Sequence, residues 1–183
     1  VFSIYGRATT SSAELSRILV KFPIDAVNTD RTNNVIPNSG NVSWYLRLSN
    51  AKHSRTVPPE AKYVIYPVSQ SWQEGIGLDL EGYKDLTKGN SGANWMSASS
   101  TAKWGVVGGT YLTASGQWEE STNPPTYTTT LASGMEDLEV DISRLVEKWI
   151  SQSAAGNPAV PGGNRLPNYG LGVHLTASQE AYF

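Results

Sequence analysis

The chain has 183 residues, no cysteine, and a formal net charge of -2 from 14 Lys and Arg against 16 Asp and Glu. Without cysteine, these residues can form no disulfide, thiolate zinc site, iron–sulfur cluster or cysteine nucleophile. Neither charge gathers into a block, and no apolar run approaches the roughly 20 residues that span a bilayer. We therefore expect neither nucleic acid nor a membrane as a partner.

The length fits one domain with one hydrophobic core, so we expect residues 1–183 to form a single domain. The 17 Gly, 10 Pro, 9 Tyr and 6 Trp are spread along the chain and favour β structure over long helices. Because the chain starts at Val1 in a strand-like stretch, we also expect it to be an excerpt of a longer polypeptide.

The first half contains three strand-like segments, at residues 17–22, 42–48 and 63–68. The second segment alternates with a period of two, which places Trp44 toward the core and Arg47 toward water. Pro67 marks an edge, a bulge or the end of the third segment. Residues 28–41 are rich in Asn, Thr, Pro and Gly, so they predict a surface connection.

Residues 77–134 have irregular apolar spacing and predict long loops with short strands. Residues 138–142 alternate again and predict a strand. A single short helix follows, capped by Asp141 or Ser143. Its apolar stripe consists of Leu145, Val146, Trp149 and Ile150.

Residues 169–175 predict the last strand, with Val173 facing inward and His174 facing outward. The small residues Gly170 and Gly172 predict a bulge or a close approach of another part of the chain. Six to eight strands, one helix near the C-terminal end and no alternation of β with α favour an all-β fold of two antiparallel sheets packed face to face.

The sequence offers little for catalysis. The two histidines are His53 and His174, no G-x-S-x-G motif is present, and both histidines have the simpler interpretation of structural or exposed residues. Spacing selects no catalytic pair from the acidic residues Glu74, Asp79, Glu81, Asp85, Glu119, Glu120, Glu136, Asp137 and Glu139. We expect no catalytic residue and no enzyme activity; a small hydrolase using such a pair is the weakest alternative.

No cofactor and no metal are expected, with one alternative. Residues 79–85 carry the oxygen ligands that Ca²⁺ accepts, but they lack the spacing and the closing Glu of an EF-hand loop. A structural Ca²⁺ there competes with a solvated acidic loop.

Aromatic residues are the best candidates for binding. Trp44 and Trp149 belong to predicted core faces, whereas four others fall in the loop-rich middle and predict an exposed platform: Trp95, Trp104, Trp118 and Tyr127. Such a platform serves either a sugar ring or a partner protein.

A series of motifs resembles one family in order along nearly the whole chain. They are Ser-Arg-Ile-Leu-Val-Lys-Phe at 16–22, Trp-Tyr-Leu-Arg-Leu at 44–48, Val-Ser-Gln-Ser-Trp-Gln-Glu-Gly at 68–75, Val-Asp-Ile-Ser at 140–143, Glu-Lys-Trp at 147–149 and Asn-Tyr-Gly-Leu at 168–171. This order resembles the DNRLRE-type domain, which implies a jelly-roll-like β-sandwich related to carbohydrate-binding modules. The family landmarks Trp72 and Trp149 imply packing roles.

Two stretches, Ser-Trp-Gln-Glu-Gly-Ile-Gly-Leu-Asp at 71–79 and Gly-Met-Glu-Asp-Leu at 134–138, are similar to structural proteins of tailed bacteriophages. The resemblance implies a virion location and a capsid, neck or tail module that contacts other virion proteins or copies of itself. The alternative is an extracellular carbohydrate-binding module that binds glycan. Residues 92–130 depart from the family pattern, so no ligand site transfers.

Overall fold

The computed structural model describes residues 5–7, 13–52, 60–75, 92–113, 126–153 and 166–182, which contain eight strands and three helices. The strands are β1 (Tyr5–Arg7), β2 (Ala13–Leu15), β3 (Ile18–Val20), β4 (Tyr45–Leu48), β5 (Ala61–Pro67), β6 (Tyr127–Leu131), β7 (Leu138–Asp141) and β8 (Leu171–Leu175). The helices are α1 (Ile24–Thr32), α2 (Ser143–Ser153) and α3 (Ala177–Tyr182).

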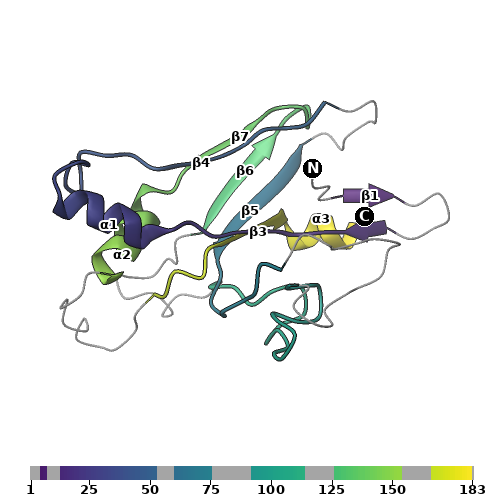
Figure 1. Ribbon diagram of the computed structural model, residues 1–183. Helices are drawn as coiled ribbons and strands as arrows, with labels where there is room; N and C mark the ends of the chain where they lie inside the picture. The colour runs from purple at the N-terminus through teal and green to yellow at the C-terminus, as the bar shows by residue number, and fades with distance from the viewer. Residues whose placement is uncertain are drawn as a thin grey trace.

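All strand pairs in this part of the chain are antiparallel. The largest sheet has the order β3-β8-β5-β6, and β4 pairs with β7 and β1 with β2 in two-stranded sheets. Figure 1 shows β4 and β7 on one side of the large sheet, beside β6, with α1 and α2 together at one end. Antiparallel sheets with a few short helices agree with the predicted all-β sandwich class.

The main core lies between the large sheet, the β4–β7 pair and α2. Within the sheet, Ile65 is opposite Val173, and both are fully buried. The predicted helix stripe is confirmed, because all four of its members are buried in this core: Leu145, Val146, Trp149 and Ile150. The predicted outward position of Arg47 on β4 is also confirmed, since its side chain is exposed and pairs with Glu139 of β7.

A second, smaller core covers the opposite face of the large sheet. Side chains of the described loop at residues 92–113 pack there, with Ala98 and Trp104 buried against Val68. Figure 1 shows this loop, in teal, on the side of the sheet away from β4 and β7. Leu19 of β3 and Trp72 pack against the same cluster, which agrees with the packing role implied for Trp72.

The close approach predicted at β8 is confirmed. A Cβ on Gly172 would collide with the ring of Tyr111, which lies over β8 at this position. Gly170 has a φ of +85°, and a Cβ there would collide with the carbonyl of Val20 on β3. The missing side chains therefore let Tyr111 and β3 contact the β8 backbone directly.

The start of α2 is fixed by polar contacts from two strands. The carboxylate of Asp141 accepts a hydrogen bond from the Ser143 N–H at 2.8 Å, as one of the two predicted caps requires. Hydrogen bonds from the side chain of Ser143 and from its backbone N–H lower the pKa of Asp141. Ser143 in turn accepts the Trp44 N–H at 2.7 Å, so the end of β7 and the starts of β4 and α2 meet at one junction.

Two expectations about helices were wrong. Residues 28–41 are not entirely a surface connection, because α1 extends to Thr32. The chain also has more than one helix, since α1 and α3 join α2 in the described residues. Helix α1 has only Ile24 buried and is held to α2 by Arg31, which donates two hydrogen bonds to Glu147.

Candidate functional site

The structure separates the three described members of the predicted aromatic platform. Trp95 is 38% exposed, whereas Trp104 is only 6% exposed and belongs to the smaller core. Tyr127 lies on β6 rather than in a loop, packs against the main core, and has a pKa raised to about 12 by burial. Trp118 lies outside the described residues. A platform of all four is therefore wrong, and Trp95 is the member that reaches the surface in the described residues.

Trp104 is buried because the loop at 92–113 folds back on itself. Its indole N–H donates to the Asn94 carbonyl at 2.7 Å, and its backbone N–H donates to the Met96 carbonyl at 3.3 Å. The Asn94 carboxamide oxygen accepts the N–H groups of Met96 and Ser97 at 2.8 and 2.7 Å. These bonds form a tight turn that holds the Trp104 ring inward.

Gln70, just after β5, attaches the far side of the loop to the sheet. Its carboxamide nitrogen donates to the Lys103 carbonyl at 2.7 Å. Its oxygen accepts the Gly105 N–H at 2.9 Å and the Thr110 hydroxyl at 2.8 Å. One side chain therefore bonds three points of the loop, which fixes the loop's shape without regular secondary structure.

The loop holds four apolar side chains out of its core. Gly108 N–H donates to the Trp95 carbonyl at 2.8 Å, which brings the two halves of the loop together at this point. The resulting surface, here named the Trp95 patch, consists of Trp95 (38% exposed), Met96 (52%), Val106 (61%) and Val107 (50%). Lys103 is the one charged residue in the 92–113 sequence. Apolar side chains held outward in an ordered loop are typical of contact surfaces.

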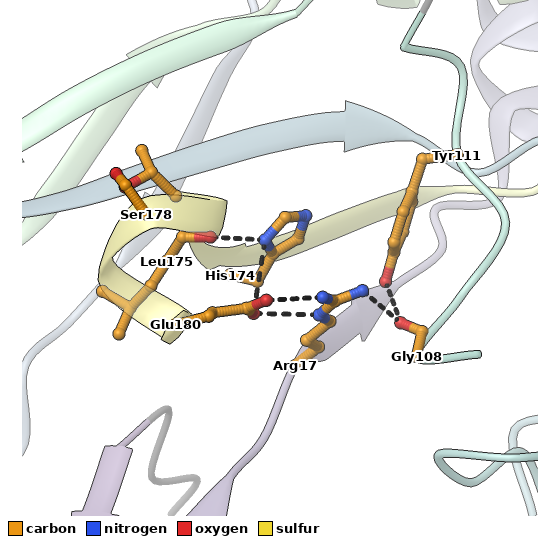
Figure 2. A network of polar contacts seen from close by, with 8 residues as sticks. Arg17, Gly108, Tyr111, His174, Leu175, Ser178 and Glu180 are labelled. Atoms are coloured by element: carbon orange, nitrogen blue, oxygen red, sulfur yellow. Dashed lines mark hydrogen bonds and ion pairs between the residues drawn. The ribbon is translucent and has the colours of Figure 1, made fainter. Parts of the chain in front are cut away.

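A polar cluster, here named the Arg17 clasp, joins this loop to α3 (Figure 2). Arg17, just before β3, donates to both carboxylate oxygens of Glu180 at 3.0 and 2.6 Å, and to the Gly108 carbonyl at 2.8 Å. The Tyr111 hydroxyl donates to the same carbonyl at 3.0 Å. The Arg17 guanidinium also lies 4.9 Å from the Trp95 ring centroid, so the clasp supports one face of that ring.

His174 lies beside the clasp and is 6% exposed, which corrects its predicted outward, exposed position. The alternation along β8 is right, but the 92–113 loop and α3 cover that face of the sheet. Its Nδ1 lies 2.6 Å from the Leu175 carbonyl, which can only accept, so Nδ1 carries the proton. The Tyr66 and Tyr111 rings lie 5.5 and 5.3 Å from its own ring.

Acid should weaken the fold through His174. Burial lowers its pKa below 6.5; the Leu175 hydrogen bond and Glu180 oppose this shift, and Arg17 adds to it. The unfolded chain then binds the proton more readily, so the stabilisation from neutral His174 is complete above pH 6.5 and is lost as pH falls through the window below that value. The free energy of unfolding, measured in urea between pH 7.5 and 5, should fall as the pH falls. The His174→Phe variant should reduce the slope of this free energy against pH. An unchanged slope would contradict this assignment.

Of the described acidic residues predicted as alternatives for chemistry, Glu136, Asp137 and Glu139 have local structural partners. Glu139 pairs with Arg47 at 2.6 Å on the exposed face of β4 and β7. Asp137 accepts the Asn50 N–H at 2.7 Å. Glu136 accepts the Ser133 N–H at 2.8 Å, and this bond lowers its pKa. Glu74 is exposed. The remaining candidate acids, His53 and the calcium candidate at 79–85 lie outside the described residues.

Two parts of this site were not predicted from the sequence. Met96, Val106 and Val107 were not singled out, although a 22-residue stretch with a single charge is a usable signal for them. Arg17 and Glu180 lie 163 positions apart, and no local pattern connects them. Only the fold brings them together.

The described ranges contain no group of three or more His, Asp or Glu residues placed to hold a metal ion. None of their helices has the length and apolar character needed to cross a membrane. Comparison with protein-family models, with curated proteins and with solved structures finds no match to this chain.

Proposed function

We propose that this chain is a non-enzymatic structural module of a tailed-phage virion, a jelly-roll-like sandwich that works by protein–protein assembly in a capsid, neck or tail. The observation that carries the proposal is the Trp95 patch. Its four apolar side chains are held outward by a loop whose shape is fixed by hydrogen bonds to Gln70 and Asn94. Such a surface binds by excluding water, as assembly contacts do.

The construction of the patch supports assembly better than catalysis. Tyr111, Glu180 and Arg17 bond to each other or to the backbone, so their polar groups are used to hold the loop. A preordered loop loses little conformational entropy when a partner covers it. The similarity of residues 71–79 and 134–138 to tailed-phage structural proteins supports the phage setting, and the patch supports the mode of action.

The proposal is tested on purified particles from the native source. Mass spectrometry should find peptides of this chain at a copy number that matches the particle symmetry, and cryo-EM should place the sandwich in ordered density. If the native protein is absent from purified particles and occurs only as a free, ligand-free monomer, the virion role is wrong.

The second candidate is the carbohydrate-binding module, which the exposure of Trp95 favours. A sugar ring can stack on an indole face, and Trp95 keeps 38% of its surface open while Arg17 supports the ring. If this candidate is right, a glycan array should give hits that Trp95→Ala weakens about tenfold or more. Tyr45→Ala is the control, because Tyr45 is an exposed aromatic residue on β4. If the wild-type chain binds no glycan on the array, this candidate is excluded.

A further inference from the structure

We infer that the Trp95 patch is a self-association surface whose occupant is the same patch on a second copy of this chain. The inference deepens the proposed function by naming the partner, and it rests on that function only for its biological setting. Its physical basis is the area, the charge and the rigidity of the patch.

The exposed area is sufficient for a weak dimer. With full areas of roughly 150–250 Å² for side chains of these sizes, the four residues expose on the order of 350 Å². Two copies would thus bury about 700 Å² of apolar surface. A specific dimer at the lower end of the size range buries about 1,200 Å², of which roughly 60% is apolar, so the two patches match the apolar area that such a contact needs.

The charge pattern favours the same patch on a second copy over a lipid surface or a charged partner. The stretch at 92–113 has a single charge, Lys103, so two copies can meet with little repulsion. A membrane-binding loop normally adds several basic residues to its apolar side chains, and this loop does not. Exposed Ser100 and Thr101 lie in the same loop and add uncharged polar groups of the kind found at the rims of protein interfaces.

The patch is also held in place from below. Arg17 fixes the Gly108 carbonyl at 2.8 Å and lies against the Trp95 ring, so both halves of the patch are tied to β3 and α3. Gly108 has a φ of +84°, and a Cβ there would lie 2.8 Å from the Arg17 guanidinium. A glycine is therefore required for this contact. A contact that uses the same patch on both copies is closed and two-fold.

Sedimentation equilibrium of the 183-residue chain tests the inference. Between about 10 and 500 µM the weight-average mass should rise from 19.8 kDa toward twice that value. Val106→Lys places a charge on the most exposed residue of the patch and should weaken the dimer at least about tenfold. Val35→Lys is the matched control, because Val35 is 70% exposed in the turn after α1 and should leave the dimer unchanged.

Three outcomes would overturn the inference. They are a monomer at every concentration, a dimer that Val106→Lys leaves intact, and binding to phosphatidylcholine–phosphatidylglycerol vesicles without self-association. The circular dichroism spectrum and urea midpoint of Val106→Lys should match those of the wild type, which shows that the variant is folded. The particle analysis is independent of this result. The chain can fail to self-associate and still be a virion component with other partners, or it can self-associate and be absent from the particle.

Discussion

Replacing Glu147 with Ala should destabilise the fold by about 2 kcal/mol in urea unfolding. Glu147 accepts two hydrogen bonds from Arg31 of α1, at 2.6 and 2.5 Å, and one from the Trp44 indole at 2.8 Å. The two charged side chains are only 10% and 18% exposed. The variant leaves a mostly buried Arg31 and an indole N–H without their acceptor, which costs more than an exposed pair but less than a fully buried one.

The matched control is Glu139→Ala, which removes an ion pair of similar length on the surface. Arg47 and Glu139 are 2.6 Å apart but 70% and 52% exposed, so the loss should stay below about 1 kcal/mol. Equal losses for Glu139→Ala and Glu147→Ala would contradict the importance of burial here.

Acid provides a second check on the same pair. The hydrogen bonds from Arg31 lower the pKa of Glu147 below 4.5. The stabilisation is therefore complete above pH 4.5 and is lost as pH falls through the lowered pKa, because the unfolded chain then takes up the proton first. The difference in unfolding free energy between wild type and Glu147→Ala should accordingly shrink below pH 4.

The strands were predictable because their signal is local. The alternation at 42–48 and 138–142 predicted the faces that β4 and β7 present, and both strands formed within those bounds. Helix α1 was missed because its sequence, rich in Asn, Asp and Thr, has low helix propensity and no apolar stripe. Its contact with Glu147 lies 116 positions away, which no window of sequence contains.

The candidate site was predictable only in part, for the same reason. Trp95 and Trp104 lie nine positions apart in one loop, and the composition of that loop does not indicate which of the two is buried. The Asn94 carbonyl accepts a hydrogen bond from the Trp104 indole and holds this ring inward. Arg17 instead lies against the Trp95 ring at the surface. His174 shows the complementary error: its alternation was read correctly, but a loop from a distant part of the sequence covers the face on which it lies.

The same loop makes Gly172 of β8 sensitive to substitution, because Tyr111 of the loop lies over it. A methyl group there would collide with the Tyr111 ring, so Gly172→Ala should cost about 2 kcal/mol although alanine normally stabilises a strand relative to glycine. Tyr111→Ala alone should cost about 3 kcal/mol, since it removes a largely buried ring and the hydroxyl that bonds Gly108.

The double variant shows whether the cost of Gly172→Ala comes from the collision with Tyr111 or from an effect on β8 alone. The two explanations predict a different change in unfolding free energy for Gly172→Ala when Tyr111 is also replaced. Once Tyr111 is alanine, the added methyl group has space, so Gly172→Ala should become neutral or stabilise by about 0.5 kcal/mol. Urea unfolding of the four proteins closes this cycle. If Gly172→Ala costs the same in both backgrounds, Tyr111 does not lie on β8 in solution, and the loop that presents the Trp95 patch is not attached to the sheet in the way described.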